Sequence, residues 1–256
     1  MKQIHAIIDR PLGSRHPEHP DLLYTVNYGF IPGMQAGDGE AQDVYILGID
    51  QPLKTFEGEV IAVIRRRDDV EEKWVAVPRG LRLTEEAIRE QTAFVERFFD
   101  SNVELLPDDF AFLPADDLTD GEVRLRLRET KPADPARRFV PAYWFDICLP
   151  DGTAVGACDL RIGHTPGLFY GGNIGYRVEE PWRGHRYAAK ACRQLFRLAH
   201  RHALEYVYIT CSPENPASER TCELAGGTYI CTADLPKEND MYQKGERRVM
   251  IYRFEV

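Results

Sequence analysis

The feature that most constrains the fold of this chain is a short apolar run that is followed by a basic loop and then by an amphipathic helix. Residues 175–178 have the composition of a strand, the loop 183–186 reads Arg-Gly-His-Arg, and a helix is expected over Tyr187–Arg201. Apolar and small residues recur along that helix at three- and four-residue spacing, so one face is buried. Its first turn presents free amides and the positive end of the helix dipole. The pattern predicts an anion-binding turn between a strand and a packed helix.

The same segments, taken with those that follow, resemble the GNAT acetyltransferases. The loop at 183–188 is similar to the family's phosphate-binding loop, and residues 173–178 look like its splayed fourth strand. A second strand at 207–210 and a helix opening at Asn215 come next in the family's order. The resemblance implies acetyl-CoA as cofactor, with its diphosphate on the loop and its pantetheine arm along the splayed strand.

The resemblance assigns a set of cofactor-binding residues. They are Tyr176, Arg177, Val178, Arg183, Gly184, His185, Arg186, Tyr187, Ala188 and Asn215. Arg186 stands where the family usually has glycine. The backbone there must adopt the family turn without the conformational freedom of that residue.

Four residues are implied as candidates for the chemistry: Asn173, Asn215, Ser218 and Cys222. Asn173 occupies the position where family members often carry a glutamate base, and asparagine cannot accept a proton. Cys222 occupies the position of the tyrosine that frequently protonates the departing thiolate. Its thiol is either that acid or a packing residue. Ser218 and a water held by Asn215 are further candidates, and positioning alone carries much of this reaction.

The N-terminal half is similar to soluble inorganic pyrophosphatases. The run Asn-Tyr-Gly-Phe-Ile-Pro-Gly at 27–33 precedes a glycine-rich turn with three acids, and further acids and Lys73 follow near 68–73. The resemblance implies a divalent metal site, with Mg²⁺ the expected ion. Hard oxygen ligands suit that ion, and two-metal sites use them to activate water. The implied ligands are Asp38, Glu40, Asp43, Asp68 and Glu71.

The phosphate-gripping side chains of that family are missing from this chain. The hairpin that supplies several of them is shortened to residues 16–20, and the family's Tyr-Lys pair falls on Phe98 and Phe99. Arg15, His16, His19 and Arg66 are the candidates for replacing them. We therefore expect metal binding with altered or lost hydrolysis. The alternative is a solvated acidic turn on a barrel that no longer binds metal.

The fold expected is two domains. Residues 1–105 form a small β-barrel with a helix, pyrophosphatase-like and OB-like, and residues 121–256 form an α/β GNAT fold with a mixed sheet. Residues 106–120 hold several acids and neither lysine nor arginine, which predicts a linker. Strands are expected at 4–8, 43–49, 60–66, 73–77, 123–128, 143–148, 154–161, 174–178 and 206–210. Helices are expected from Thr84, over 187–201 and over 216–224, and a hairpin joins 228–233 to 249–254.

Composition narrows the function further. The net charge of −9 argues against a nucleic-acid or membrane surface. The lack of a long apolar run or signal peptide predicts a cytoplasmic protein. All six cysteines fall in the second half without short paired spacing, so reduced thiols are expected. These observations leave the oligomeric state open.

We expect an acetyl-CoA-dependent N-acetyltransferase whose acceptor is a small-molecule or peptide amine. The rival is a Mg²⁺-dependent pyrophosphatase or phosphohydrolase with a CoA-sensing second domain. A third hypothesis is that the N-terminal half is a non-catalytic binding module. Phosphate release with and without Mg²⁺ separates the last two.

Overall fold

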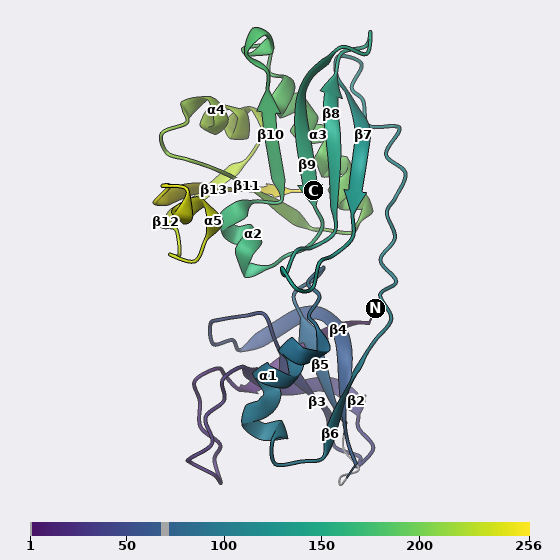
Figure 1. Cartoon of the computed structure of the whole chain (residues 1–256), viewed down its shortest axis with the longest axis vertical. Helices are drawn as coiled ribbons and strands as arrows, with labels where there is room; N and C mark the ends of the chain where they lie inside the picture. Colours follow the sequence, from purple (N-terminus) through teal and green to yellow (C-terminus); the bar gives the residue numbers. More distant parts are fainter. Residues whose placement is uncertain (1, 68–71) are drawn as a thin grey trace. The chain divides into compact units, whose positions relative to one another are not determined.

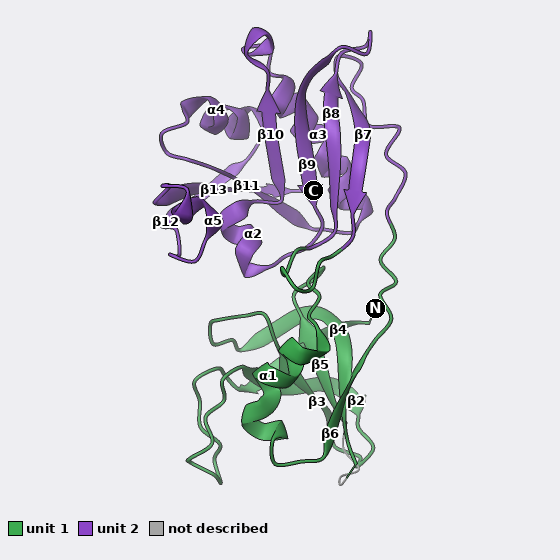
Figure 2. Ribbon diagram, viewed as in Figure 1, with its two compact units in different colours: residues 1–111, 133–139 green, residues 112–132, 140–256 purple. Residues whose placement is uncertain are grey.

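The chain folds into two compact units (Figures 1 and 2). The computed structural model describes residues 2–67 and 72–256. Unit 1 comprises residues 1–111 and 133–139, and unit 2 comprises residues 112–132 and 140–256. The acidic stretch expected as a linker is therefore divided between the two, with residues 106–111 in unit 1 and 112–120 in unit 2. No helix in the described part of the chain is long and apolar enough to cross a membrane.

Unit 1 is the expected small barrel with a helix. Its strands are β1 (Gln3–Arg10), β2 (Asn27–Gln35), β3 (Ala41–Ile46), β4 (Thr55–Arg66), β5 (Glu72–Val77) and β6 (Ser101–Leu105). The strand order is β1-β2-β3-β5-β4-β6, and β1 pairs also with β4, which closes the first five strands into a ring. Among the described residues of unit 1, β3 and β5 are the one pair of parallel strands. Helix α1 (Glu85–Glu96) begins after Thr84, whose side chain accepts a hydrogen bond from the Ala87 amide.

Strand β2 was not expected, because its glycines and proline are unusual within a strand. One of these glycines, Gly29, is required by the close approach of β1. A Cβ atom at Gly29 would lie 2.0 Å from the carbonyl oxygen of Ile7 on β1, so only glycine permits this pairing. The run at 27–33 is therefore a barrel strand in its own right. Strand β6 was also missed, and it lies beside β4 at the end of the sheet.

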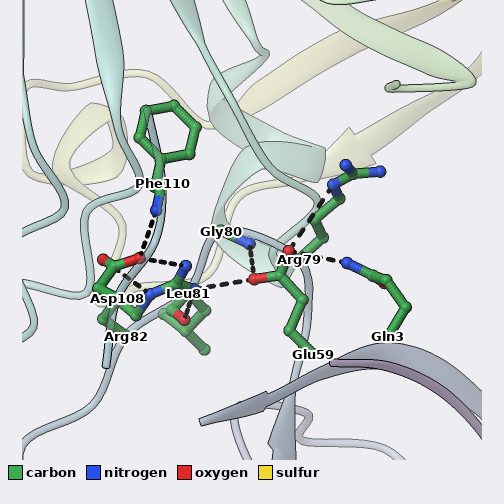
Figure 3. A network of polar contacts seen from close by, with 8 residues as sticks. All are labelled: Gln3, Glu59, Arg79, Gly80, Leu81, Arg82, Asp108 and Phe110. Carbon is green, nitrogen blue, oxygen red and sulfur yellow. Dashed lines mark hydrogen bonds and ion pairs between the residues drawn. The ribbon is translucent and has the colours of Figure 1, made fainter. Parts of the chain in front are cut away.

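A buried polar network ties several segments of unit 1 together (Figure 3). At its centre is Glu59 of β4, whose carboxylate accepts hydrogen bonds from Arg82 Nη1 at 2.9 Å and from the Gly80 amide at 3.2 Å. Arg82 also contacts Asp108 through Nε and Nη2. The network therefore joins β4 to the segment through which the chain leaves this unit.

Unit 2 contains two antiparallel sheets. Strands β7 (Arg124–Lys131), β8 (Ala142–Cys148), β9 (Ala154–Arg161) and β10 (Ile174–Val178) form the first, in the order β10-β9-β8-β7. Strands β11 (Tyr206–Cys211), β12 (Thr228–Asp234) and β13 (Arg248–Glu255) form the second, in the order β11-β13-β12. The expected hairpin of residues 228–233 and 249–254 is the β12–β13 pair.

Helices complete unit 2. They are α2 (Pro166–Gly171), a single 3₁₀ turn at Glu180–Trp182, α3 (Tyr187–Arg201), α4 (Pro216–Ala225) and α5 (Asp240–Gln243). Helix α3 has the predicted bounds, and its small and apolar face, with Ala191, Cys192 and Leu195 fully buried, packs on the first sheet. The short helices α2 and α5 were not expected. Each spans too few residues to show helical periodicity.

Candidate functional site

The two sheets of unit 2 meet at one residue and then diverge. The Asn173 amide donates to the Tyr208 carbonyl at 2.7 Å. Beyond that contact β10 pairs with β9 alone, and β11 pairs with β13 alone. The edge of β10 that faces β11 therefore carries backbone groups without a strand partner in the part of the chain that the structure describes. Apart from the Val178 carbonyl, which accepts from Arg183 Nε, such groups are available to an extended ligand lying along the strand.

Asn173 holds this junction together. Its side chain is fully buried and donates to the Arg161 carbonyl at 3.0 Å and to the Gly163 carbonyl at 2.8 Å. Its amide oxygen accepts from Tyr208 N at 2.9 Å. Both donors of the amide are therefore used by main chain. Asn173 thus links β9, β10 and β11 through its side chain. Its hydrogen-bonding groups are all engaged, so none is left for proton transfer.

The basic loop leads from β10 into α3 through two left-handed residues. Gly184 has φ of 86°, and Arg186 has φ of 62° with ψ of 19°. Arg186 thus adopts the turn expected of glycine at this position. The side chain of the N-cap residue Arg186 makes no capping hydrogen bond, so it leaves the first-turn amides at Tyr187 and Ala188 to another acceptor. Arg183, His185 and Arg186 are all exposed around this turn, which makes it suited to an anion.

Two substitutions of Arg186 are expected to differ in stability because only one relieves the left-handed backbone. Both Arg186→Gly and Arg186→Ala remove the charge. Alanine retains the steric cost of this conformation, so the glycine variant should be more stable by about 1 kcal/mol. Urea unfolding of the two variants measures the difference. Equal stabilities would show that residue 186 is not held in the left-handed region.

Side chains from β10, α4 and β11 meet on the side of β10 that faces α4. The hydroxyl of Tyr176 lies 2.8 Å from Ser218 Oγ and 4.0 Å from Cys222 Sγ on α4. Burial raises the pKa of Tyr176. A hydrogen bond with Cys211 of β11 raises the pKa of Cys222, and the same bond lowers the pKa of Cys211. Tyr176 and Cys222 are therefore neutral donors near neutral pH.

The remaining predicted residues lie around this cluster. Asn215 caps α4, its side chain accepting from the Ser218 amide at 3.1 Å. Arg177 is exposed and pairs with Glu179. Arg183 Nε donates to the Val178 carbonyl at 3.2 Å, and the His185 ring stacks on Tyr187. The strand, the loop and α4 are thus brought to one end of the first sheet.

Sequence reasoning missed Asp159 and Arg161 on β9. Asp159 is paired in register with Gly175, and Arg161 Nη2 lies 2.9 Å from its carboxylate. The alternation of polar and apolar residues along β9 looks like an ordinary half-exposed strand. A buried carboxylate at one of its polar positions becomes visible only once β10 is placed beside it.

In unit 1, three of the predicted metal ligands line one small pocket. Asp38, Glu40 and Asp43 surround a space of about 210 Å³ with Glu72 and Lys73. The Lys73 ammonium lies 2.5 Å from Asp43 Oδ2, and Asp38 accepts from the Glu40 amide. No group of three or more His, Cys, Asp or Glu residues suited to a metal occurs among the described residues. Asp68 and Glu71 lie outside them. The described acids alone do not fit a metal centre.

Three of the four candidates for replacing the phosphate grips are engaged elsewhere. Arg66 is buried, pairs with Glu96 at 2.7 Å and lies over the Phe99 ring at 3.6 Å. Arg15 donates to the Pro20 carbonyl, and His16 Nδ1 accepts from the amides of the following turn. Phe98 is 65% exposed on the surface. Arg66, Arg15 and His16 thus have partners within unit 1.

Comparison with known proteins gives a family match and weak structural likenesses. A family model described as an acetyltransferase (GNAT) domain matches residues 82–228. A microcin C7 self-immunity acetyltransferase, solved with acetyl-CoA and AMP, is 18% identical with a TM-score of 0.37, over 45% of this chain and 61% of that one. A putative ribosomal-protein-serine acetyltransferase from Vibrio cholerae is 18% identical with a TM-score of 0.35, over 45% of this chain and 64% of that one.

An inorganic pyrophosphatase from Ehrlichia chaffeensis is 27% identical, with a TM-score of 0.26 over 30% of this chain and 60% of that one. The chain thus spans 60% to 64% of the length of these three structures. No curated protein matches it.

Proposed function

Since this chain belongs to the GNAT acetyltransferase family, we propose that unit 2 transfers the acetyl group of acetyl-CoA to an amine. One observation carries the proposal. The edge of β10 that β11 leaves free is followed, after one 3₁₀ turn and the basic loop, by the start of α3, which has no side-chain cap. An extended arm that ends in a diphosphate matches that arrangement, because the strand edge offers backbone hydrogen bonds and the helix start offers positive charge.

The cofactor would lie with its diphosphate on the loop of residues 183–188. The amides of Tyr187 and Ala188 and the side chains of Arg183 and Arg186 supply the positive end. The pantetheine arm would pair with the main chain of residues 176–178. Asn215 and Ser218, at the start of α4, would close the opening from the far side.

The reaction needs few protein groups. The amine nitrogen attacks the thioester carbonyl carbon, the C–N bond forms, the C–S bond breaks, and sulfur leaves with the electron pair. Holding amine and thioester in contact supplies much of the rate. The hydroxyl of Tyr176, the thiol of Cys222 and the hydroxyl of Ser218 supply neutral donors on the side of β10 that faces α4.

Arg183→Glu tests the cofactor site. Reversing the charge beside a diphosphate should weaken binding of acetyl-CoA at least tenfold, about 1.4 kcal/mol. Calorimetry measures the affinity. Arg248→Glu is the matched control, because it makes the same change in unit 2 on β13, in an exposed pair with Asp234. Wild-type affinity in a folded Arg183→Glu variant would contradict the assignment.

The acceptor requires a search. A panel of small amines, amino acids and peptides with free N-termini, assayed by release of free thiol from acetyl-CoA, tests transfer. Release that depends on the amine supports the proposal. Binding of acetyl-CoA without transfer to any amine would favour the rival reading, in which this unit senses CoA.

For unit 1 we propose a pyrophosphatase-like barrel that has lost efficient hydrolysis of diphosphate. The support is that Arg66 is buried against Glu96 and Phe99, and that Lys73 pairs with Asp43 within the acidic pocket. The side chains that would neutralise a highly charged substrate are therefore committed to the protein.

Phosphate release from pyrophosphate should accordingly stay near background, with or without Mg²⁺. Losing two or three charge-assisted hydrogen bonds, each about 1.5–3 kcal/mol, lowers turnover by several orders of magnitude. A colorimetric phosphate assay on the purified chain checks this. Rapid hydrolysis that requires Mg²⁺ would instead establish the phosphohydrolase reading.

A further inference from the structure

Asp159 lies beside the point where the cofactor arm must end. The arm enters at the start of α3 and runs along β10 towards Asn173, where the junction of β10 with Tyr208 blocks the way. The thioester therefore comes level with Gly175, two residues beyond Asn173. Gly175 is the register partner of Asp159. This placement rests on the proposed function.

The carboxylate of Asp159 fills the space that a side chain at Gly175 would take. A Cβ atom there would lie 2.6 Å from Asp159 Oδ1. Directly paired residues point to the same face of a sheet. The carboxylate thus lies over the backbone of β10, at the level where the thioester would end.

This face is opposite to the one that carries α3. Cys158 and Leu160 are buried, and Cys158 lies near Cys192 of α3. Successive strand residues alternate between faces, so Asp159 and Arg161 lie on the other side. Tyr176, next to Gly175, points towards α4. The thioester can therefore contact the hydroxyl and thiol donors near α4 on one face of β10 and Asp159 on the other face.

Only part of the hydrogen-bonding capacity of Asp159 is used. Arg161 Nη2 lies 2.9 Å from Oδ2, yet this buried oxygen accepts no hydrogen bond. Arg161 is itself fixed, since its Nη1 donates to the Gly172 carbonyl at 3.0 Å. The carboxylate is therefore held in place by a neighbouring charge, and one of its oxygens accepts no hydrogen bond.

We propose that Asp159 is the base that receives the proton of the acceptor ammonium, which makes the substrate class a cationic alkylamine. One N–H proton moves to the Asp159 carboxylate, and the nitrogen lone pair attacks the thioester carbon. The C–N bond forms, the C–S bond breaks, and the departing thiolate takes a second proton from nitrogen. Asp159 then releases its proton to solvent.

The electrostatics suit this role. Burial raises the pKa of Asp159, and Arg161 and the Gly175 amide oppose that rise only in part. A base whose pKa is closer to neutrality transfers protons more effectively at neutral pH. The positive charge of Arg161 favours the ionised form of this carboxylate.

The test compares two kinds of amine in Asp159→Asn. An alkylamine is an ammonium ion at neutral pH and must lose a proton before attack, whereas hydroxylamine is already neutral. The variant should lose about 100-fold or more in kcat/KM with the alkylamine, the usual size of a base effect, and much less with hydroxylamine. Release of CoA thiol gives both rates, and calorimetry should give unchanged affinity for acetyl-CoA.

Asp146→Asn is the matched control, since Asp146 lies on the same face and also pairs with an arginine, Arg126, at 2.8 Å. It should retain wild-type rates with both amines. Equal losses with both amines in Asp159→Asn, or the same loss in Asp146→Asn, would overturn the assignment. Wild-type protein that binds acetyl-CoA but transfers to neither amine would contradict the proposed function itself.

Discussion

Replacing Asn173 by aspartate is expected to lower the free energy of unfolding of unit 2 by about 3–5 kcal/mol, the cost of an uncompensated buried charge. The substitution changes a single atom group. It sets a carboxylate oxygen against the carbonyls of Arg161 and Gly163, which now accept from the asparagine amide. Oxygen then faces oxygen at a fully buried position, and both carbonyls lose their donor.

Urea or thermal unfolding measures this loss. Asn239→Asp is the matched control, because Asn239 caps α5 by accepting from the Met241 amide, and an aspartate accepts equally well. That variant should stay within about 0.5 kcal/mol of wild type. An Asn173→Asp protein as stable as the control, with faster acetyl transfer, would show that residue 173 has the room and freedom of a catalytic base.

The fate of Asn173 shows what a family pattern can and cannot predict. The pattern placed this residue at the catalytic position of the splayed strand, and it does lie where β10 and β11 separate. Its hydrogen bonds reach Gly163 and Tyr208, ten and thirty-five residues away in the chain. Partners so distant in sequence follow from topology, which a local motif does not encode.

Elements with strong local signals were predicted best. Helix α3 has the predicted bounds because the spacing of its apolar residues identifies its buried face. The start of α1 was predicted from Thr84, which caps the helix. Strand β2 was missed because glycines and a proline interrupt it, and the reason for Gly29 lies on β1. The need for a left-handed residue at Arg186 was foreseen, since the loop pattern itself requires the turn.

Pairs formed between strands escaped prediction for the same reason. Lys73 and Asp43 come together because β3 and β5 pair in parallel, although thirty residues separate them. Arg66 was expected to be available to phosphate, and it is held by Glu96 of α1. Each of these contacts changes the chemistry inferred for unit 1, and each depends on how the barrel closes.

Glu59→Ala should lower the free energy of unfolding of unit 1 by about 3–5 kcal/mol. The Glu59 carboxylate accepts from Arg82, from the Gly80 amide and from Gln3 of β1, and Arg79 lies nearby at 3.8 Å (Figure 3). Its side chain and that of Arg82 are each 10% exposed. Truncation leaves the Gly80 amide without this acceptor and Arg82 with Asp108 as its remaining carboxylate partner.

Glu57→Ala supplies the control on the same strand. Glu57 is 81% exposed and pairs with His5 at the surface, so its loss should cost less than about 0.5 kcal/mol. Glu59→Gln should fall between the two, because it keeps an acceptor for the Gly80 amide while removing the charge. Chemical denaturation of the three variants gives the order. If Glu59→Ala and Glu57→Ala unfolded alike, the attraction between Glu59 and Arg82 would only balance the cost of burying both charges, and the segment at 78–84 would be held by its apolar contacts instead.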